Sequence, residues 1–148
     1  MLHGIQRIIA ILVFVLLTLG MHTNARAQQT PMTITYEQTI SGSLDATDPT
    51  LEDRSAYFDK YVFQGELGKS YQITVKSDTF SVWVYLSVSE GQGDYILQAA
   101  YVVLPGDQVQ FSGTLKQPGE YTIKVSSFED VAVGPYTLTL SEGQRPGP

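Results

Sequence analysis

The chain contains no cysteine, and its only two histidines, His3 and His22, lie close to the N-terminus. Without cysteine there can be no disulfide, no cysteine nucleophile and no lipid attached through an N-terminal Cys. Basic residues are also scarce, with 9 Lys and Arg against 15 Asp and Glu and a formal net charge of −6. This acidic balance argues against nucleic acid and anionic membrane surfaces as partners, because both are bound by clusters of Lys and Arg.

Residues 1–27 have the three parts of a secretory signal peptide. Arg7 precedes the apolar run Ile8–Leu19, and Ala25-Arg26-Ala27 ends the segment with small residues where a signal peptidase reads. The run has roughly a dozen residues, whereas a membrane-spanning helix needs about 20. We expect cleavage after Ala27, export to the periplasm or the exterior, and no stable membrane anchor afterwards. An uncleaved anchor is the alternative.

Removal of 27 of the 148 residues leaves a mature chain of 121 residues without histidine or cysteine. Lys and Arg fall from 9 to 7 while the 15 acids remain, so the formal charge moves from −6 to −8. The common catalytic triads and dyads cannot be built from this composition, and zinc loses its two best ligands. The adjacent acids Glu52-Asp53 and Glu129-Asp130 leave a carboxylate-based hydrolase as the least favoured alternative. We expect no enzyme.

Alternation of β-branched and aromatic residues with polar ones runs through the mature chain and is typical of strands. The predicted strands cover residues 33–40, 57–63, 70–76, 82–88, 95–103, 108–115, 121–125 and 135–140. About eight short strands in a chain of this length predict a single antiparallel β-sandwich, jelly-roll-like in type. We expect this domain over residues 28–140, with a long loop at 41–56 and a flexible tail at 141–148.

Five segments, in this order, carry a resemblance to a known family. They are Ser41–Asp45 (SGSLD), Ala56–Phe63 (AYFDKYVF), Gly68–Phe80 (GKSYQITVKSDTF), Pro118–Ser127 (PGEYTIKVSS) and Gly134–Leu140 (GPYTLTL). Over about 100 residues they resemble the bacterial pre-peptidase C-terminal (PPC) domain, a β-sandwich appended to many secreted proteases and found alone in some exported proteins. The resemblance implies a stand-alone, non-catalytic module. This sequence departs from the family at Ser81, where an Asp is usual, and at 97–104, which has no acid.

Calcium is the one cofactor that the sequence suggests, and no cofactor at all is the alternative. Ca²⁺ takes six to eight oxygen ligands, mostly carboxylates and carbonyls on a flexible loop. The loop between residues 45 and 59 is rich in acids, and some members of the resembled family bind calcium near this region. The candidate ligands are Asp45, Asp48, Glu52, Asp53 and Asp59. Their spacing matches no EF-hand loop, so a solvated acidic loop is the other interpretation.

Aromatic side chains on the predicted strand at 82–88 form the second candidate site. Four apolar residues, Val82, Val84, Leu86 and Val88, share one face of this strand. If that face is the core, Trp83 and Tyr85 point outward as a contact surface for a peptide, protein or glycan, and Tyr95 and Tyr101 on the next strand extend it. Alternatively, the strand is covered on both faces.

Two other tyrosines are expected to belong to the core. Tyr121 and Tyr136 each follow a turn and begin an inward-facing alternation, so their hydroxyls should cap turns at the edge of the sandwich. Taken together, the residues favour an exported, non-catalytic accessory module that binds a protein, peptide or glycan. The alternative is a structural or chaperone-like domain with no small-molecule ligand.

Overall fold

The computed structural model describes residues 29–90 and 93–144, and within them it contains nine strands and no helix. The signal peptide predicted at 1–27 lies outside the described residues. No helix able to span a bilayer occurs in the part of the chain that the structure describes.

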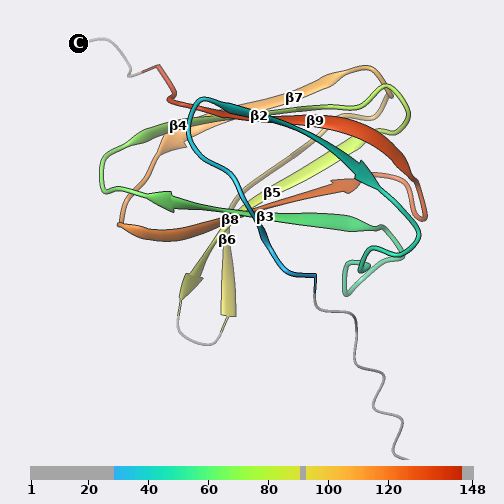
Figure 1. Cartoon of the computed structure of the whole chain (residues 1–148), viewed down its shortest axis with the longest axis horizontal. Helices are drawn as coiled ribbons and strands as arrows, with labels where there is room; N and C mark the ends of the chain where they lie inside the picture. Colours follow the sequence, from blue (N-terminus) through green and yellow to red (C-terminus); the bar gives the residue numbers. More distant parts are fainter. Residues whose placement is uncertain (1–28, 91–92, 145–148) are drawn as a thin grey trace, which may run out of the picture.

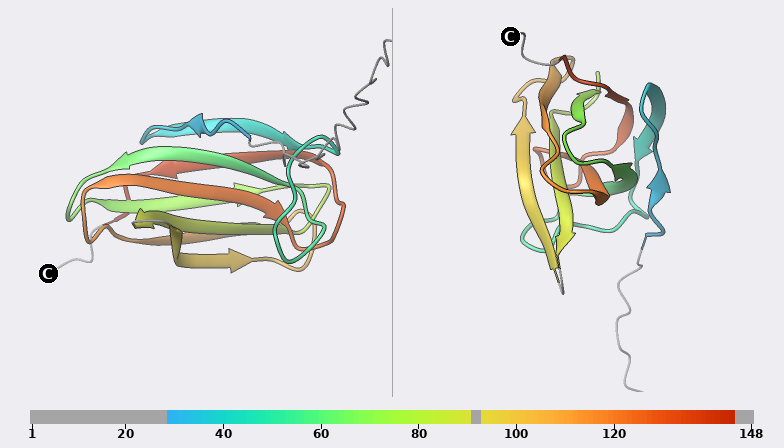
Figure 2. Two further views of the ribbon diagram at one scale, coloured as in Figure 1. Left: turned by 90° about the horizontal axis from the view of Figure 1, so that it is seen from below. Right: turned by 90° about the vertical axis from the view of Figure 1, so that its left-hand side faces the viewer.

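Two sheets face each other in a sandwich (Figure 1), and Figure 2 shows the same two layers from two further directions. The five-stranded sheet has the order β1-β3-β8-β5-β6 and the four-stranded sheet the order β2-β9-β4-β7. The strands are β1 (Met32–Thr33), β2 (Gln38–Leu44), β3 (Phe58–Gly65), β4 (Ser70–Lys76), β5 (Val82–Glu90), β6 (Gly93–Tyr101), β7 (Gln108–Thr114), β8 (Gly119–Ser127) and β9 (Gly134–Ser141). All neighbours are antiparallel except β1 and β3, which are parallel.

The connections define a jelly roll. Strand β2 lies beside β9 in one sheet, while β3 lies beside β8 in the other, so the first strands pair with the last. Moving inward along the chain, β4 pairs with β7 and β5 with β6. This nesting of pairs across two sheets is the jelly-roll topology, and it confirms the fold class predicted from the sequence.

The N-terminal strand differs from its prediction, because residues 33–40 do not form one strand. The chain turns at Tyr36-Glu37, where Glu37 adopts a φ of 63°, and passes from the five-stranded sheet to the other. The side-chain oxygen of Gln38 accepts a hydrogen bond from the backbone N–H of Thr35 at 2.9 Å and holds this turn. Strand β2 then continues to Leu44, so the first residues of the predicted loop at 41–56 belong to a strand.

Strict alternation places the core between the sheets. On β5, Val82, Val84 and Leu86 are fully buried, which confirms that the valine face of this strand points inward. The inward set also includes two series predicted from the sequence, which are Tyr121, Ile123 and Val125 on β8 and Tyr136, Leu138 and Leu140 on β9. The hydroxyl of Tyr121 donates to the carbonyl of Gln117 at 2.7 Å and so caps the preceding turn as expected.

The hydroxyl of Tyr136 has a different partner from the one predicted. It donates across the core to the carboxylate of Asp59 on β3, and the Tyr61 hydroxyl lies 2.6 Å from it. Burial and these bonds raise the pKa of Tyr136 far above its ordinary value. Room for the ring depends on Gly42, because a Cβ there would lie 2.4 Å from Tyr136 Cζ. The two sheets are therefore joined by a buried polar contact, and not only by apolar packing.

Replacing Tyr136 with Phe tests this contact. The ring remains, but the buried Asp59 carboxylate loses a hydrogen bond, so we expect the free energy of unfolding to fall by about 1.5–3 kcal/mol. Urea unfolding followed by circular dichroism measures it. Tyr95→Phe is the matched control, since Tyr95 is 61% exposed and should leave the midpoint unchanged. Equal midpoints for all three proteins would contradict the role given to Tyr136.

Candidate functional site

Four strands of the five-stranded sheet, β3, β8, β5 and β6, align their outward side chains in rows that cross the sheet. One row consists of Phe58, Ser126, Trp83 and Tyr101, because each residue is the register partner of the next. The neighbouring row consists of Lys60, Lys124, Tyr85 and Ala99. Directly paired residues share a face, so aromatic rings and lysines lie side by side on the outer surface of this sheet.

Four aromatic rings form a cluster at one end of this surface. The ring centroid of Trp83 lies 5.3 Å from that of Tyr85, 5.9 Å from that of Tyr101 and 5.7 Å from that of Phe128. Tyr101 and Phe128 stack on each other at 5.1 Å. Tyr101 is 56% exposed and Phe128 39%, whereas Trp83 and Tyr85 are half-buried. We call Trp83, Tyr85, Tyr101 and Phe128 the aromatic cluster.

Arg54, from the long loop before β3, covers part of the aromatic cluster. Its guanidinium carbon lies 4.9 Å from the centroid of Trp83 and 5.9 Å from that of Phe128, both within cation–π range. Its Nε donates to Asp130 at 3.2 Å, and its terminal nitrogen donates to the Phe128 carbonyl. Trp83 and Tyr85 thus point outward from the sheet, but Arg54 of the long loop covers part of the Trp83 ring.

Tyr95 does not extend this surface, contrary to the expectation from the sequence. A bulge on β6 leaves Leu97 unpaired and shifts the register between Leu86 and Ser87. As a result Tyr95 pairs with Val88, a core-facing residue, while Tyr101 pairs with Trp83. An extra residue in one strand reverses the faces beyond it, which explains the error. Tyr95 lines a separate hollow of about 280 Å³.

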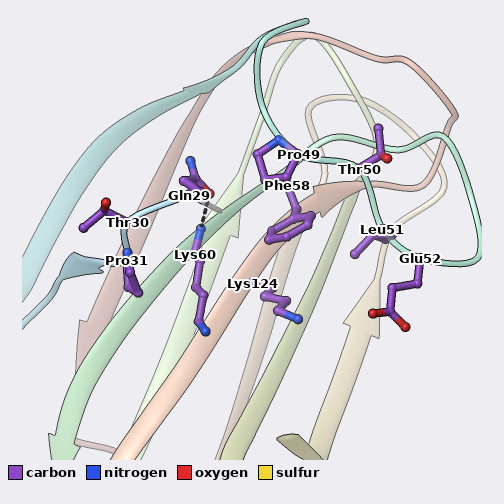
Figure 3. A pocket seen from close by; sticks show the side chains of 10 residues that line it. All are labelled: Gln29, Thr30, Pro31, Pro49, Thr50, Leu51, Glu52, Phe58, Lys60 and Lys124. Carbon is purple, nitrogen blue, oxygen red and sulfur yellow. Dashed lines mark hydrogen bonds between the residues drawn. The ribbon is translucent and has the colours of Figure 1, made fainter. Parts of the chain in front are cut away.

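A larger hollow of about 760 Å³ lies on the same outer surface as the aromatic cluster (Figure 3). The N-terminal segment, residues 29–31, forms one side, and residues 49–52 of the long loop form the other. Phe58, Lys60 and Lys124 lie between these two walls. The Lys124 ammonium is 5.2 Å from the Phe58 centroid and 4.0 Å from an Asp94 oxygen. Within residues 29–90 and 93–144, Lys60 forms no ion pair.

The acids proposed as calcium ligands do not share one site, and several of them accept hydrogen bonds from different groups of the protein. Asp45 accepts hydrogen bonds from the backbone N–H and the hydroxyl of Thr47, which lower its pKa. Asp48 accepts one from the backbone N–H of Asp45 at 2.8 Å, and burial raises its pKa. Asp59 is buried beneath Tyr136 and also accepts the Gln29 side-chain amide at 2.7 Å. No group of three or more acids or histidines that could hold a metal ion occurs among the described residues.

The other acids of the loop lie beside the outer surface. Glu52 lines the hollow, and Asp53 is near enough to Tyr85 to raise the pKa of its hydroxyl. Glu129 accepts hydrogen bonds from the backbone N–H and the hydroxyl of Ser81, at 3.1 and 2.6 Å. At the position where the resembled family usually has Asp, this chain therefore has a serine paired with an acid from the loop between β8 and β9. Of the two pairs considered for a hydrolase, Glu129-Asp130 therefore has structural partners, in Ser81 and Arg54.

The sequence did not identify Lys60 and Lys124 of the hollow, nor Arg54 and Phe128 beside the aromatic cluster. Phe128 follows directly after a strand and has no pattern that marks it. Arg54 is the only basic residue between Asp45 and Asp59, and a lone cation in an acidic loop is a signal for an internal ion pair. Its partner, Asp130, is 76 residues away, so only the folded chain reveals the contact.

Comparisons with known proteins identify the class of fold. No protein-family model matches the chain, and no curated protein matches it significantly. The pre-peptidase C-terminal domain of collagenase from Bacillus anthracis superposes with a TM-score of 0.53 and 25% identity, covering 77% of this chain and 97% of that domain. PliG, a periplasmic inhibitor of g-type lysozyme from Aeromonas hydrophila, has a TM-score of 0.54 and 14% identity, with 77% and 96% covered.

These likenesses define a β-sandwich of the PPC type. At 14% identity the inhibitor shows the shared fold alone, whereas the collagenase domain, at 25% identity, supports a PPC-like fold. The first of these structures is one domain of a collagenase, and its likeness to this chain is consistent with an accessory module.

The titration of Tyr85 tests the arrangement of loop and sheet. Burial, together with the nearby Asp53 carboxylate, raises its pKa from 10.0 to about 12, against the opposing effect of Arg54. Because the folded pKa lies above the unfolded one, this contribution to stability is complete below pH 10 and is lost as the pH rises towards 12. Asp53→Asn should lower the pKa of Tyr85, measured by carbon-13 tyrosine NMR with Tyr85→Phe for assignment. Asp107→Asn, in another loop, should leave it unchanged.

The calcium prediction is checked by thermal melting. A cation that binds only the folded state raises the melting midpoint, and a chelator should reverse the rise. Asp45→Asn should abolish the effect, because it removes a carboxylate from the loop. Magnesium at equal concentration controls for ionic strength. A midpoint that does not respond to calcium would refute binding.

Proposed function

We propose that this protein is an exported, non-catalytic accessory module that binds a partner through the outer surface of its five-stranded sheet. The partner is a glycan, a peptide or a segment of a protein that lies over the aromatic cluster. Export rests on the signal peptide predicted at residues 1–27. The absence of catalysis rests on a mature composition that lacks histidine and cysteine, and on the types of protein that share the fold.

The observation that carries this proposal is the exposure of the aromatic cluster. Tyr101 and Phe128 together leave large ring surfaces open to solvent; they stack on each other and pack at tilted angles against the half-buried Trp83. Rings held by stacking contacts are rigid, so they lose little conformational freedom when a ligand covers them. Aromatic residues are enriched in contact surfaces for this reason, and they stack well on the faces of sugars and peptide groups.

Arg54 adds a way to control access to the surface. Its guanidinium lies over Trp83 and is held by Asp130, which is 59% exposed at its side chain. The Arg54 side chain itself is 18% exposed, so a ligand that displaces it from the ring must replace its contacts with Asp130 and the Phe128 carbonyl. The surface thus has a fixed part on the sheet and an adjustable part in the loop.

Trp83 provides the experiment, because it is the only tryptophan in the chain. A ligand that covers the aromatic cluster should change its fluorescence, so intensity and emission maximum can be recorded against a panel of glycans and peptides, collagen peptides among them. For the ligands that bind, Tyr101→Ala should weaken affinity about two- to tenfold, since one stacking ring is removed.

Tyr95→Ala is the matched control for this measurement. It removes the same residue type from the same strand, but on the opposite face, so it should leave affinity unchanged. Equal losses for the two variants would place binding elsewhere. A panel without any effect on Trp83, combined with no binding by calorimetry, would refute the proposal.

A further inference from the structure

Lys60 and Lys124 stand directly opposite each other on β3 and β8, and this pairing is unfavourable in the free protein. Side chains of like charge that face each other across antiparallel strands destabilise the sheet. The chain is acidic and has few basic residues, so two of them side by side are not explained by a general surplus of positive charge. The stability of the fold therefore does not explain why two lysines occupy these paired positions.

Negative charge near this pair is sparse. Among the described residues, Glu52 is the only acid that lines the hollow, and it belongs to the wall formed by residues 49–52. The contact between Lys124 and Asp94 is long, at 4.0 Å, while Lys124 also lies against the Phe58 ring. Lys60 has no acidic partner among the described residues. An anion placed in the hollow would meet two ammonium groups that repel each other in its absence.

We propose that this hollow binds the carboxylate or sulfate groups of an acidic polysaccharide, a ligand class that rests on the proposed function of the outer surface. Lys124 pairs with Tyr85, and Tyr85 stacks on Trp83, so cationic and aromatic groups follow one another without a gap. A chain of sugars can place an acidic group between the two lysines and a neighbouring ring against the aromatic cluster. Charge and ring stacking then select the same ligand from adjacent positions.

The position on the sheet favours a polysaccharide over an acidic peptide. Peptides that bind sheets usually add a strand at a free edge, where backbone groups are unpaired. Here β3 pairs with β8, and β8 also pairs with β5. On the other side of β3, the N–H groups of Phe58 and Lys60 are already bonded to the Pro49 carbonyl and the Gln29 side chain, so the floor of the hollow offers no such edge. The walls instead carry the hydroxyl groups of Thr30 and Thr50, which suit the hydroxyl groups of sugars.

Polygalacturonate and its fully methyl-esterified form are the probes for the experiment, because they share a backbone and differ in charge. Alginate, hyaluronan and heparin extend the acidic set. Trp83 fluorescence and calorimetry should show that at least one acidic polymer binds and that its affinity falls as the salt concentration rises. The methyl-esterified polymer should bind at least tenfold more weakly than polygalacturonate. Lys60→Gln and Lys124→Gln should each weaken binding about tenfold, since each removes a charge-assisted hydrogen bond.

Lys76→Gln is the matched control, because it makes the same charge change on β4 of the other sheet. It should leave the affinity unchanged, and circular dichroism should show all three variants folded. If none of the four acidic polymers binds, or if the control loses as much as the two variants, the inference is overturned. Binding of poly-L-glutamate as tightly as the polysaccharides, with the same dependence on Lys60, would overturn the choice of a sugar ligand.

The two proposals fail in different ways. If Tyr101→Ala weakens binding of a ligand while the two lysine variants do not, the aromatic surface functions without the anionic site, and only this inference fails. If Tyr101→Ala has no effect on any ligand of the panel, the proposed function fails as well.

Discussion

The carboxylate of Asp59 lies between the two sheets, 4% exposed, where it accepts the hydroxyl of Tyr136 and the side-chain amide of Gln29. A buried carboxylate is tolerated only when it is hydrogen-bonded, so β3 must stay aligned with β9 of the facing sheet and with the N-terminal segment. Because neighbours along a strand point to opposite faces, an inward Asp59 forces Phe58 and Lys60 outward. The floor of the hollow therefore depends on the same residue that joins the sheets.

The outer surface follows from strand register in the same way. Pairing of β3 with β8 and of β8 with β5 brings Lys60, Lys124 and Tyr85 into one row, although they are far apart in the sequence. The long loop then lies against this surface through Arg54, which contacts Trp83 and Asp130. Strands thus provide the side chains of the proposed binding surface, and a loop covers part of it, a division of roles common in binding modules.

The sequence predicted the orientation of some residues and misplaced others. Alternation on β5 predicted the buried valines and the outward Trp83, since a period of two is a local property that hydrophobicity reveals. Tyr95 was assigned to the wrong face because a bulge at Leu97 inserts one residue, and nothing in the sequence marks it. Asp59 was grouped with the acids of the loop, but its true partner, Tyr136, is 77 residues away. Neither misplacement could be corrected without long-range contacts.

Composition and alternation by themselves determined that the chain after residue 27 is all-β and lacks histidine and cysteine, because these properties do not depend on which residues are neighbours in space. The tertiary structure alone decided that two lysines face each other, that Arg54 covers Trp83 and that Tyr95 faces away from Tyr101. Pairing between distant strands fixes those relations, and it is set by the packing of the whole core and not by any local signal.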